Sequence, residues 1–439
     1  MSQRVCFVSQ RDYPGDGRLN TEITALIEAG YAVDMIAMKP AGAPFTSVEA
    51  GVRIMRIPSL TRQRAGKVRY VAEYLSFFVP VCLLLALLQV VRGYRVVHIT
   101  NLPDVLVFAG LIPKLLGAKI VFDVRECTPE MFMDRFGAQP GGRIIRVMTR
   151  IEQAALRFAH ASVTCTEQMR QALISRGADG DKIAVMLNTS YLQTPRPITP
   201  PPPDQVIDGP LRIITHGTVI KRYGHEVLID AMALVITELP NARLEILGKG
   251  QAVPDLQAQV ERLGLGDYVT FSGFVPDEVL VERIMAAHIG AVTLMQNPEA
   301  DLVHTFKMYE YMQLATPMVI SATSAVTSYF SSDTLRFFQP GDARSLADAL
   351  LELARDPALR HRLAVNGLRV YEQCSIPKQR ALYRSLVERV LASATPLIEQ
   401  PAVGAGRVAS TGKASLITRR DYAGQGEVLT AISTKDETL

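Results

Sequence analysis

The chain lacks tryptophan and has only five cysteines among its 439 residues, none of them in a CxxC pair. Zinc sites and disulfide frameworks use cysteines that are paired at short spacings, so the sequence supports neither kind of site. Reduced thiols in a cytoplasmic protein are therefore the simplest interpretation. The apolar run that begins at Val5 is too short for the core of a signal peptide, and it indicates a buried first strand instead.

No charge of one sign predominates, because 47 Lys and Arg residues stand against 43 Asp and Glu residues, for a net charge of +4. Proteins that bind nucleic acids usually carry a basic stripe, so this balance gives no support for that function. The first loop of each half also lacks a G-x-G-x-x-G motif, which disfavours a dehydrogenase. Hydrophobic residues make up 48% and charged residues 21%, which excludes a mainly disordered chain, a coiled coil or a collagen.

Short apolar runs alternate with longer helical stretches, a pattern typical of βα units and parallel sheets. In the first half we expect strands at 5–9, 32–37, 96–100, 119–123 and 161–165, and helices at 19–29, 104–116 and 143–159. In the second half we expect strands at 211–215, 243–247, 268–272, 289–294 and 318–321, helices at 224–237 and 255–263, and helical periodicity from 343 to about 392.

A proline-rich stretch separates the two halves and is predicted to be an extended linker at 191–210. The fold class is therefore α/β, with two doubly wound, Rossmann-like domains at 1–190 and 211–375. A helix at 376–393 is free to pack back on the first domain, and 396–439 is predicted to be a disordered tail. Ligands of such sheets bind at the carboxyl ends of the strands, and two such domains facing each other would form a cleft for two substrates.

One long apolar segment raises the question of membrane contact. From Tyr70 to Val91 the only charged residue is Glu73, and basic residues lie just upstream. Three interpretations stay open. The segment is long enough to span a bilayer, although Glu73 and Pro80 interrupt it. It can also be a buried helix of the first domain, or a helix whose outer face docks on anionic lipid.

The most informative stretch of the second half begins at His304. Thr305 is a good N-cap for the helix that follows, and the free N–H groups of that helix start can bind a phosphate. Lys307 adds a cation in the first turn, and Glu310 follows on the same face, where a carboxylate can accept hydrogen bonds from both ribose hydroxyls. The alternative is an ordinary Lys–Glu pair on the helix surface.

A second stretch with candidate binding residues follows the first strand of the second half. Gly217 permits a close backbone approach, and Lys221 and Arg222 lie in the loop before a helix, where they can clamp a diphosphate. The alternative is a loop with solvated cations. A third loop, Gly248-Lys249-Gly250, also follows a strand, but a lone GxG is weak support for a binding site.

Both halves resemble glycosyltransferase family 4, whose members have the GT-B fold and transfer sugars with retention. In the second half the resemblance lies in HGTVIKRYGHEVLIDA, in VTFSGFVPDEVL, which contains Phe274 and is similar to a base-binding loop, and in FKMYEYMQLATPMV. In the first half it lies in YPGDGRLNTEITALIEAGYAVDMI and VVHITNLPDVLVFAGLIPKLLGAKIVFDVREC. The shared order and spacing of these motifs, from about Arg4 to Leu391, is the strong part of the resemblance.

The resemblance implies a nucleotide-sugar site in the second domain. Glu310 would bind the donor ribose and Arg222 the diphosphate, with Lys307 as a third catalytic-site residue. Other expected donor-binding residues are Gly217, Thr218, Lys221, Gly248, Gly250, Phe274 and Thr305. The chain departs from the family at Leu302, where many members have a second Glu, and at Thr218, where an Arg is common.

The first domain is expected to bind the acceptor. Five polar residues follow predicted strands and are expected to face the cleft: Asp16, Arg18, Asp104, Arg125 and Glu126. Arg125 replaces a His that many family members have. Asp16 and Arg18 are equally well explained as residues that cap a loop. His98 lies inside a strand and is expected to be a core histidine.

The function expected from these features is transfer of a sugar from a nucleotide-diphosphate sugar to a glycan or polyprenyl-linked acceptor in cell-surface polysaccharide biosynthesis. We expect no cofactor or metal, no nucleic-acid partner, and a cytoplasmic protein held at the inner face of the membrane through Tyr70–Val91. The alternatives are a sugar-nucleotide epimerase of the same architecture and a non-catalytic partner that keeps the fold.

Overall fold

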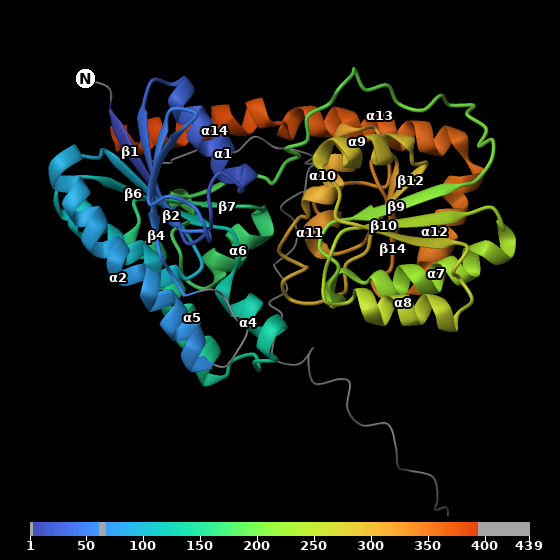
Figure 1. The fold of residues 1–439 in the computed structure, drawn as a ribbon, viewed down its shortest axis with the longest axis horizontal. Coiled ribbons are helices and arrows are strands. Elements are labelled where there is room, and N and C mark those ends of the chain that lie inside the picture. Colours follow the sequence, from blue (N-terminus) through green and yellow to red (C-terminus); the bar gives the residue numbers. More distant parts are fainter. Residues whose placement is uncertain (1–2, 61–66, 394–439) are drawn as a thin grey trace, which may run out of the picture. The chain divides into compact units, whose positions relative to one another are not determined.

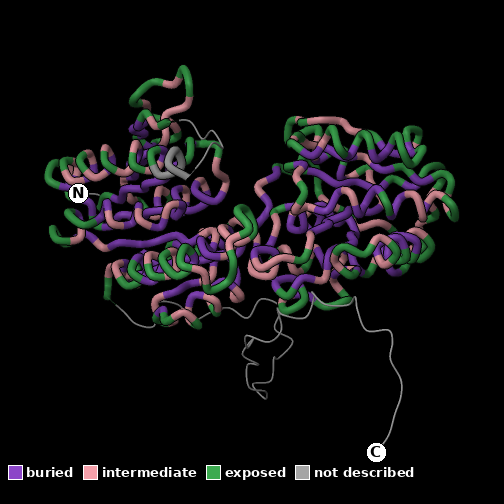
Figure 2. Tube along the Cα trace, turned by 90° about the horizontal axis from the view of Figure 1, so that it is seen from below, coloured by how far each residue is buried: buried purple, intermediate pink, exposed green. Residues whose placement is uncertain are grey.

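The computed structural model describes residues 3–60 and 67–393, with side chains from residue 72 onward in the second range (Figure 1). These residues form two parallel α/β sheets with helices on their faces, so the predicted fold class is confirmed. The tail expected at 396–439 lies outside the described residues. Figure 2 shows that buried residues follow the strands, while exposed residues follow the outer faces of the helices.

Within the described residues the first sheet has eight strands, in the order β3-β4-β2-β1-β5-β6-β7-β8. All neighbours are parallel except β3 and β4, which form an antiparallel hairpin that the sequence analysis did not predict. The strands are β1 (Arg4–Ser9), β2 (Ala32–Met38), β3 (Thr46–Glu49), β4 (Val52–Ile57), β5 (Val96–Thr100), β6 (Lys119–Val124), β7 (Ala161–Thr164) and β8 (Ile183–Val185).

The first sheet is covered by α1 (Gly17–Glu28), α2 (Lys67–Arg92), η1 (Asp104–Gly110), α3 (Leu111–Leu115), α4 (Thr128–Phe136), α5 (Arg143–Phe158), α6 (Glu167–Ser175) and η2 (Gly180–Lys182). The single helix predicted at 104–116 is wrong, because the structure has a 3₁₀ helix followed by one short α-helix. The division between Gly110 and Leu111 fits Pro113, which lies in the first turn of α3, where a residue without an N–H costs no intrahelical hydrogen bond.

Within the described residues the second sheet has six strands, in the order β11-β10-β9-β12-β13-β14, and its neighbours are parallel. The strands are β9 (Arg212–His216), β10 (Arg243–Leu247), β11 (Val269–Gly273), β12 (Ile289–Val292), β13 (Met318–Ser321) and β14 (Arg336–Phe338). The helices are η3 (Lys221–Tyr223), α7 (His225–Glu238), α8 (Val253–Arg262), α9 (Asp277–Ala286), α10 (Phe306–Gln313), α11 (Ser324–Thr327), α12 (Ala343–Arg355) and α13 (Pro357–Cys374).

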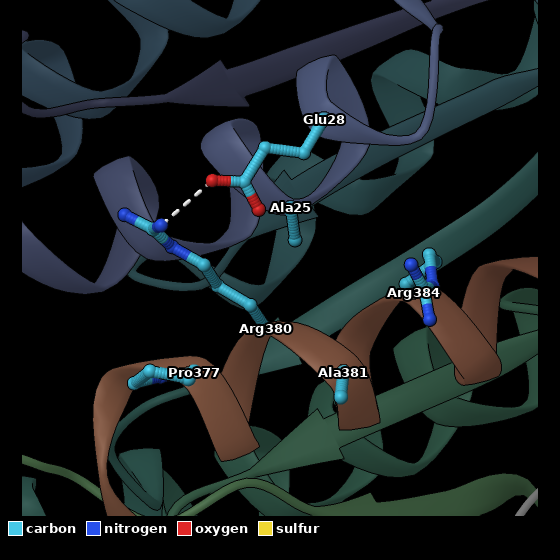
Figure 3. Close-up of a pocket in the computed structure, with 6 residues that line it drawn as sticks. All are labelled: Ala25, Glu28, Pro377, Arg380, Ala381 and Arg384. Atoms are coloured by element: carbon cyan, nitrogen blue, oxygen red, sulfur yellow. Dashed lines mark hydrogen bonds and ion pairs between the residues drawn. The ribbon is translucent and has the colours of Figure 1, made fainter.

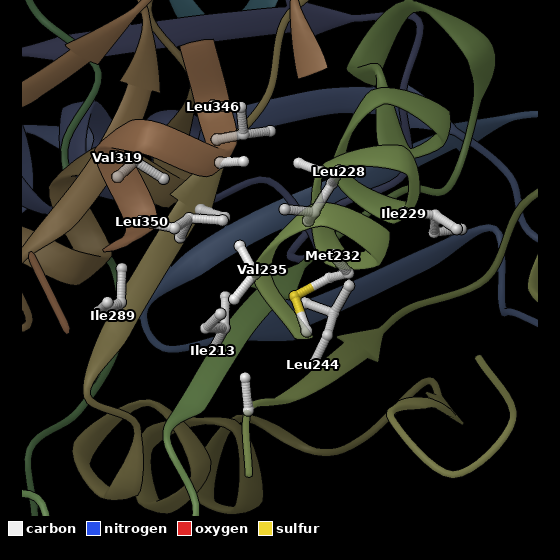
Figure 4. Close-up of a cluster of buried hydrophobic side chains, with 14 of the residues drawn as sticks. Ile213, Leu228, Ile229, Met232, Val235, Leu244, Ile289, Val319, Leu346 and Leu350 are labelled. Atoms are coloured by element: carbon white, nitrogen blue, oxygen red, sulfur yellow. The ribbon is translucent and has the colours of Figure 1, made fainter. Parts of the chain in front are cut away.

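The core of the second sheet lies between its strands and helices α7 and α12. Leu228 and Met232 of α7 meet Leu346 and Leu350 of α12 above the strand residue Ile213 (Figure 4). Each of these side chains is at most 1% exposed. Their burial fixes β9, and with it the loop after β9 in which candidate binding residues lie.

Helix α14 (Ile376–Ala392) follows the second domain in sequence but packs on the first. Its buried face places Tyr383 and Leu386 in the hydrophobic cluster of β1, β2 and α1. The Tyr383 hydroxyl lies 2.7 Å from Nδ1 of His98, which is fully buried in β5. His98 is therefore a core histidine with a partner, and α14 ties the end of the described chain to its first sheet.

A shallow cavity of about 310 Å³ lies between α1 and α14 (Figure 3). Its lining includes Glu28 and Arg380, which form an exposed ion pair at 2.8 Å. The cavity thus marks the seam at which α14 meets α1. It contains none of the candidate site residues.

Replacing Leu386 with Ala is expected to destabilise the first domain by about 2–5 kcal/mol, because it leaves a cavity at a fully buried site. Urea unfolding of the full chain measures this change. Arg384→Ala on the same helix is the control, since its side chain is 52% exposed, and it is expected to change stability by less than about 0.5 kcal/mol. Equal effects of both changes would contradict the packing of α14 as described.

Candidate functional site

The loops that follow β9 and β10 touch each other through three glycines. The N–H of Gly217 donates to the Leu247 carbonyl at 2.9 Å. A Cβ placed on Gly248 would lie 1.8 Å from the carbonyl oxygen of Gly217, and one on Gly250 would lie 1.9 Å from that of Val219. Side chains at these positions are therefore excluded by neighbouring backbone. Gly248 and Gly250 hold the two loops together at the carboxyl edge of the sheet.

Helix α10 begins next to these loops. Thr305 occupies the N-cap position as predicted, but its side chain makes no capping hydrogen bond, and its hydroxyl oxygen is buried without a hydrogen-bond partner among the described residues. The expectation that the Thr305 side chain caps the helix is therefore wrong. The N–H groups of the first turn lack an intrahelical acceptor in any α-helix, so this end of α10 is suited to an anion.

Lys307 lies in the first turn of α10 and is only 8% exposed. Its ammonium nitrogen lies 4.3 Å from the ring centre of Tyr223, and its side chain passes Gly217 so closely that a Cβ there would be 2.9 Å from Lys307 Cε. Burial lowers the pKa of Lys307 to about 8, although Glu310 acts in the opposite direction. The loop glycine thus makes room for a buried ammonium group whose pKa burial lowers.

Glu310 lies one turn after Lys307, on the same side of α10. Its carboxylate is 3.3 Å from Nε2 of His216, and burial raises its pKa to about 7. Burial, followed by the charge of Lys307, lowers the pKa of His216 to about 3, so that this histidine is neutral at pH 7. The alternative of a solvated Lys–Glu surface pair is therefore wrong, because the surrounding protein buries both side chains.

Arg222 reaches the same region from η3. Its NH1 atom donates to the Glu299 carboxylate at 2.6 Å, and the backbone carbonyl of Arg222 accepts from the N–H of Met295 at 3.0 Å. The Arg222 side chain is 32% exposed and that of Glu299 is 8% exposed. Burial raises the pKa of Glu299, while Arg222 lowers it.

The remaining second-domain candidates lie around this cluster. Thr218 and Lys221 are exposed in the loop after β9. Phe274 follows β11 and is 70% exposed, with the Lys249 ammonium 5.9 Å from its ring centre. An exposed ring beside a cation offers a flat face on which a nucleobase can stack. The structure therefore gathers the cations, the carboxylate and the helix end, and leaves an aromatic ring accessible.

Three residues that the sequence analysis did not single out belong to this cluster: His216, Tyr223 and Glu299. Tyr223 contacts two cations, because the Arg222 guanidinium also lies 5.3 Å from its ring centre. Tyr223 and His216 lie inside a motif that carries the resemblance. Their positions next to Arg222 and Gly217 in the sequence could have identified them as site residues. Glu299 lies near the position of the family's second Glu but out of register with it. Its contact with Arg222 gave no local signal, because the two residues are 77 positions apart.

The first-domain candidates divide into two groups. Arg18 and Asp104 are each 3% exposed. Arg18 donates to the Met186 carbonyl and to Asp123, while Asp104 accepts hydrogen bonds from Asn101 and Thr128. The expectation that Arg18 and Asp104 face a cleft is therefore wrong, because their hydrogen-bonding groups are used inside the domain.

Asp16, Arg125 and Glu126 are less deeply buried. Arg125 bonds to Asp16 and Asp123, each at 2.5 Å, and its side chain is 10% exposed. Asp16 also accepts from the N–H of Leu19 and so caps α1, as the loop-capping alternative expected. Glu126 is 24% exposed and lies 3.8 Å from Arg11. These three side chains mark the edge of the first sheet.

Comparison with known protein families gives matches to both domains. Residues 18–189 match a family described as glycosyl transferase 4-like domain, and residues 202–370 match one described as glycosyl transferases group 1. Together the two matches account for most of the chain. The first match ends just before the predicted linker, and the second begins within it.

Curated relatives share parts of the chain. An alpha-D-kanosaminyltransferase of Streptomyces kanamyceticus is 28% identical over 161 residues, which is 36% of this chain and 40% of that protein. A GDP-mannose-dependent alpha-(1-6)-phosphatidylinositol dimannoside mannosyltransferase of Mycobacterium tuberculosis is 34% identical over 108 residues, which is 24% of this chain and 26% of that protein. The chain thus aligns with less than half the length of these relatives.

Solved structures resemble the whole fold at low sequence identity. Sucrose-phosphate synthase from Thermosynechococcus elongatus superposes with a TM-score of 0.71 at 18% identity, covering 89% of this chain and all of that chain. The lipopolysaccharide glycosyltransferase WaaG gives 0.62 at 14% identity, with 87% and 99% covered. Both family matches and the two-sheet architecture agree. The chain is therefore a glycosyltransferase of family 4 with the GT-B fold.

Proposed function

We propose that the protein moves a sugar, with retention, from a nucleotide-diphosphate sugar to a glycan or polyprenyl-linked acceptor in cell-surface polysaccharide biosynthesis. The observation that carries this proposal is the cluster at the start of α10: buried Lys307, Glu310 with a side chain only 14% exposed, and Arg222 beside them. Two neighbouring cations and a free helix end suit a diphosphate, and a buried carboxylate suits a ribose.

The donor diphosphate would lie against the first N–H groups of α10, between Lys307 and Arg222. Thr218 and Lys221, both exposed in the loop after β9, would add contacts from the solvent side. Glu310 would accept hydrogen bonds from the ribose hydroxyls, and Phe274 would stack on the base. Gly217, Gly248 and Gly250 would set the loop backbones that surround the diphosphate.

Departure of the diphosphate is the costly event in such a transfer. Fixed positive charge at Arg222 and Lys307 would stabilise the charge that develops on it, and preorganised groups of this kind typically contribute several kcal/mol. The leaving diphosphate would accept the proton of the acceptor hydroxyl, so no covalent nucleophile is required. Because these cations would do the work of a metal ion, we propose that no metal or cofactor takes part.

The acceptor would lie against the first domain. We propose Asp16, Arg125 and Glu126 as its contacts, since they are the less buried members of the predicted set. Arg18 and Asp104 would act indirectly, by holding Asp123 and Thr128 in place. Mycobacterial relatives are named for phosphatidylinositol acceptors, which supports an acceptor that carries a lipid.

A lipid-linked acceptor fits the exposed face of α2. Among the described residues, α2 contains the one helical segment that is long and apolar enough to cross a membrane, Ala72–Arg92. Its inner face packs in the first-domain core through Phe77, Val81 and Leu85. Its outer face exposes Leu83 by 71% and Leu87 by 61%. A helix with one face in the core leaves only the other face for lipid.

Neighbouring helices extend this surface. Helices α2, α3 and α5 all pack on the same cluster or on η1, and α3 exposes Leu115 by 72%. Arg143, Arg146 and Arg150 are exposed on α5. The acidic residues of these three helices, Glu73 and Glu152, are both buried. Exposed leucines flanked by arginines suit an anionic bilayer, so we propose a cytoplasmic enzyme held at the inner face of the membrane.

Glu310→Ala is expected to reduce transfer at least 100-fold and to weaken nucleoside-diphosphate binding, because it removes the proposed ribose contact. Transfer assays with UDP- and GDP-sugars and a polyprenyl-diphosphate sugar acceptor measure the first effect, and calorimetry measures the second. Glu352→Gln, which alters an exposed ion pair on α12, is the control. Near wild-type transfer by Glu310→Ala would show that Glu310 does not bind the donor. Formation of an epimerised donor in the absence of acceptor would contradict the proposed transferase activity.

The affinity for a nucleoside diphosphate is expected to fall as the pH rises through about 8. Lys307 has a pKa lowered to about 8 by burial, so it is charged below that pH and neutral above it. A bound anion favours the charged form. Calorimetry between pH 7 and 9.5 measures the effect. Lys307→Met is expected to bind weakly at every pH, and an unchanged pH profile in this variant would contradict the role of Lys307.

The double change Leu83→Glu and Leu87→Glu is expected to abolish binding to vesicles that contain phosphatidylglycerol, because it places two carboxylates on the proposed docking face. Co-sedimentation with vesicles of phosphatidylcholine alone and of a mixture with phosphatidylglycerol measures binding. The control is Val206→Glu, since Val206 is 83% exposed but lies outside α2. Equal binding by wild type and the double variant would show that α2 does not dock.

A further inference from the structure

The contact between Arg222 and Glu299 differs in geometry from the contact between Arg176 and Glu152 in the first domain. Arg176 donates two hydrogen bonds to the Glu152 carboxylate, from Nε to Oε1 and from NH2 to Oε2, both at 2.8 Å. Arg222 holds Glu299 by one point, NH1 to Oε1 at 2.6 Å. A two-point pair is geometrically matched and strong, whereas a one-point pair leaves donors and acceptors unused.

The unused atoms of this pair are buried. Nε of Arg222 and Oε2 of Glu299 both lie out of contact with solvent and without a hydrogen-bond partner among the described residues. Burying such groups unsatisfied costs free energy, so the contact is incompletely satisfied. A diphosphate can satisfy the guanidinium more fully, because it offers several oxygens to a planar fork of donors.

The chain keeps the two residues side by side. The backbone bond from Met295 to Arg222 joins the segment before α10 to η3. Thr293 makes a second bond to this loop, from its hydroxyl to the Tyr223 carbonyl at 2.6 Å. These two bonds anchor the segment that leads to Glu299 on the loop of Arg222, so the carboxylate lies where the donor diphosphate is proposed to bind.

From this geometry we propose that Glu299 is a built-in anion that occupies Arg222 while the donor is absent and gives it up to the donor diphosphate. Glu299 thereby sets specificity for a diphosphate. This inference rests on the proposed function. A diphosphate can displace the carboxylate because it also gains the end of α10 and Lys307, whereas a monophosphate reaches fewer of these partners and competes poorly.

The consequence for affinity follows from the fraction of molecules with Arg222 free. If that fraction is about one in ten, the apparent affinity is about tenfold weaker than that of the unblocked site. Removing the charge of Glu299 is therefore expected to strengthen binding. If Glu299 only positioned Arg222 for the diphosphate, removing its charge would weaken diphosphate binding instead.

The test is calorimetry of UDP, GDP, ADP and dTDP, and of the corresponding monophosphates, with wild type and Glu299→Gln. The variant is expected to bind the preferred diphosphate about tenfold more tightly, and the monophosphate to gain affinity by a larger factor. Glu352→Gln is the control, since it removes one charge from another Arg–Glu pair of the same domain and is expected to change neither affinity. Glu299→Asp, which withdraws the carboxylate from Arg222, is expected to give an intermediate gain and replaces Glu299→Gln if that variant does not fold.

A double-mutant cycle identifies the partner of Glu299. In an Arg222→Ala background, Glu299→Gln is expected to change diphosphate affinity less than twofold, because the contact it relieves is already gone. Unchanged or weaker binding by Glu299→Gln alone would overturn the inference while leaving the donor site in place. Wild-type protein that binds none of the four diphosphates would overturn both this inference and the proposed function.

Discussion

The cluster at the start of α10 depends on the burial of one cation, Lys307, beneath a loop that only glycine can form. The Lys307 side chain fills the space in which a Cβ of Gly217 would lie, and Gly248 presses on the same loop from the next strand. An ammonium in this position loses hydration, and this burial lowers its pKa to about 8. An incoming diphosphate would restore the lost stabilisation. The close contact between loops thus prepares an anion site before any anion binds.

The first domain uses buried charge in the opposite way. Arg18 and Arg125 share Asp123, and Arg125 is also held by Asp16. These arginines have carboxylate partners on more than one side, so their charges are compensated within the fold. In the second domain Arg222 meets a single carboxylate by a single contact. The difference explains why we assign anion binding to the second domain and a supporting role to Arg18.

Helix α2 reconciles the interpretations of the apolar segment. One face carries Phe77, Val81 and Leu85 into the core, and the opposite face leaves Leu83 and Leu87 in solvent. A helix that is apolar all round is normally buried all round or placed in lipid. Here the sheet covers only one side, so the composition of α2 is more apolar than its burial requires. That excess is the physical basis for proposing a lipid surface as its second partner.

The alternation of apolar runs was enough to predict two parallel α/β domains, most strands, and the helix that carries Lys307 and Glu310. These features are local, because strand and helix periodicity follow from the backbone geometry of a few consecutive residues. The division of 104–116 just before Pro113 was also readable in principle. The packing of α14 on the first domain was expected as an arrangement that the sequence permits. The burial of Arg18 and Asp104 and the meeting of Arg222 with Glu299 were not readable. Each joins segments far apart in the chain, and only the packing of sheets and loops brings them within contact distance.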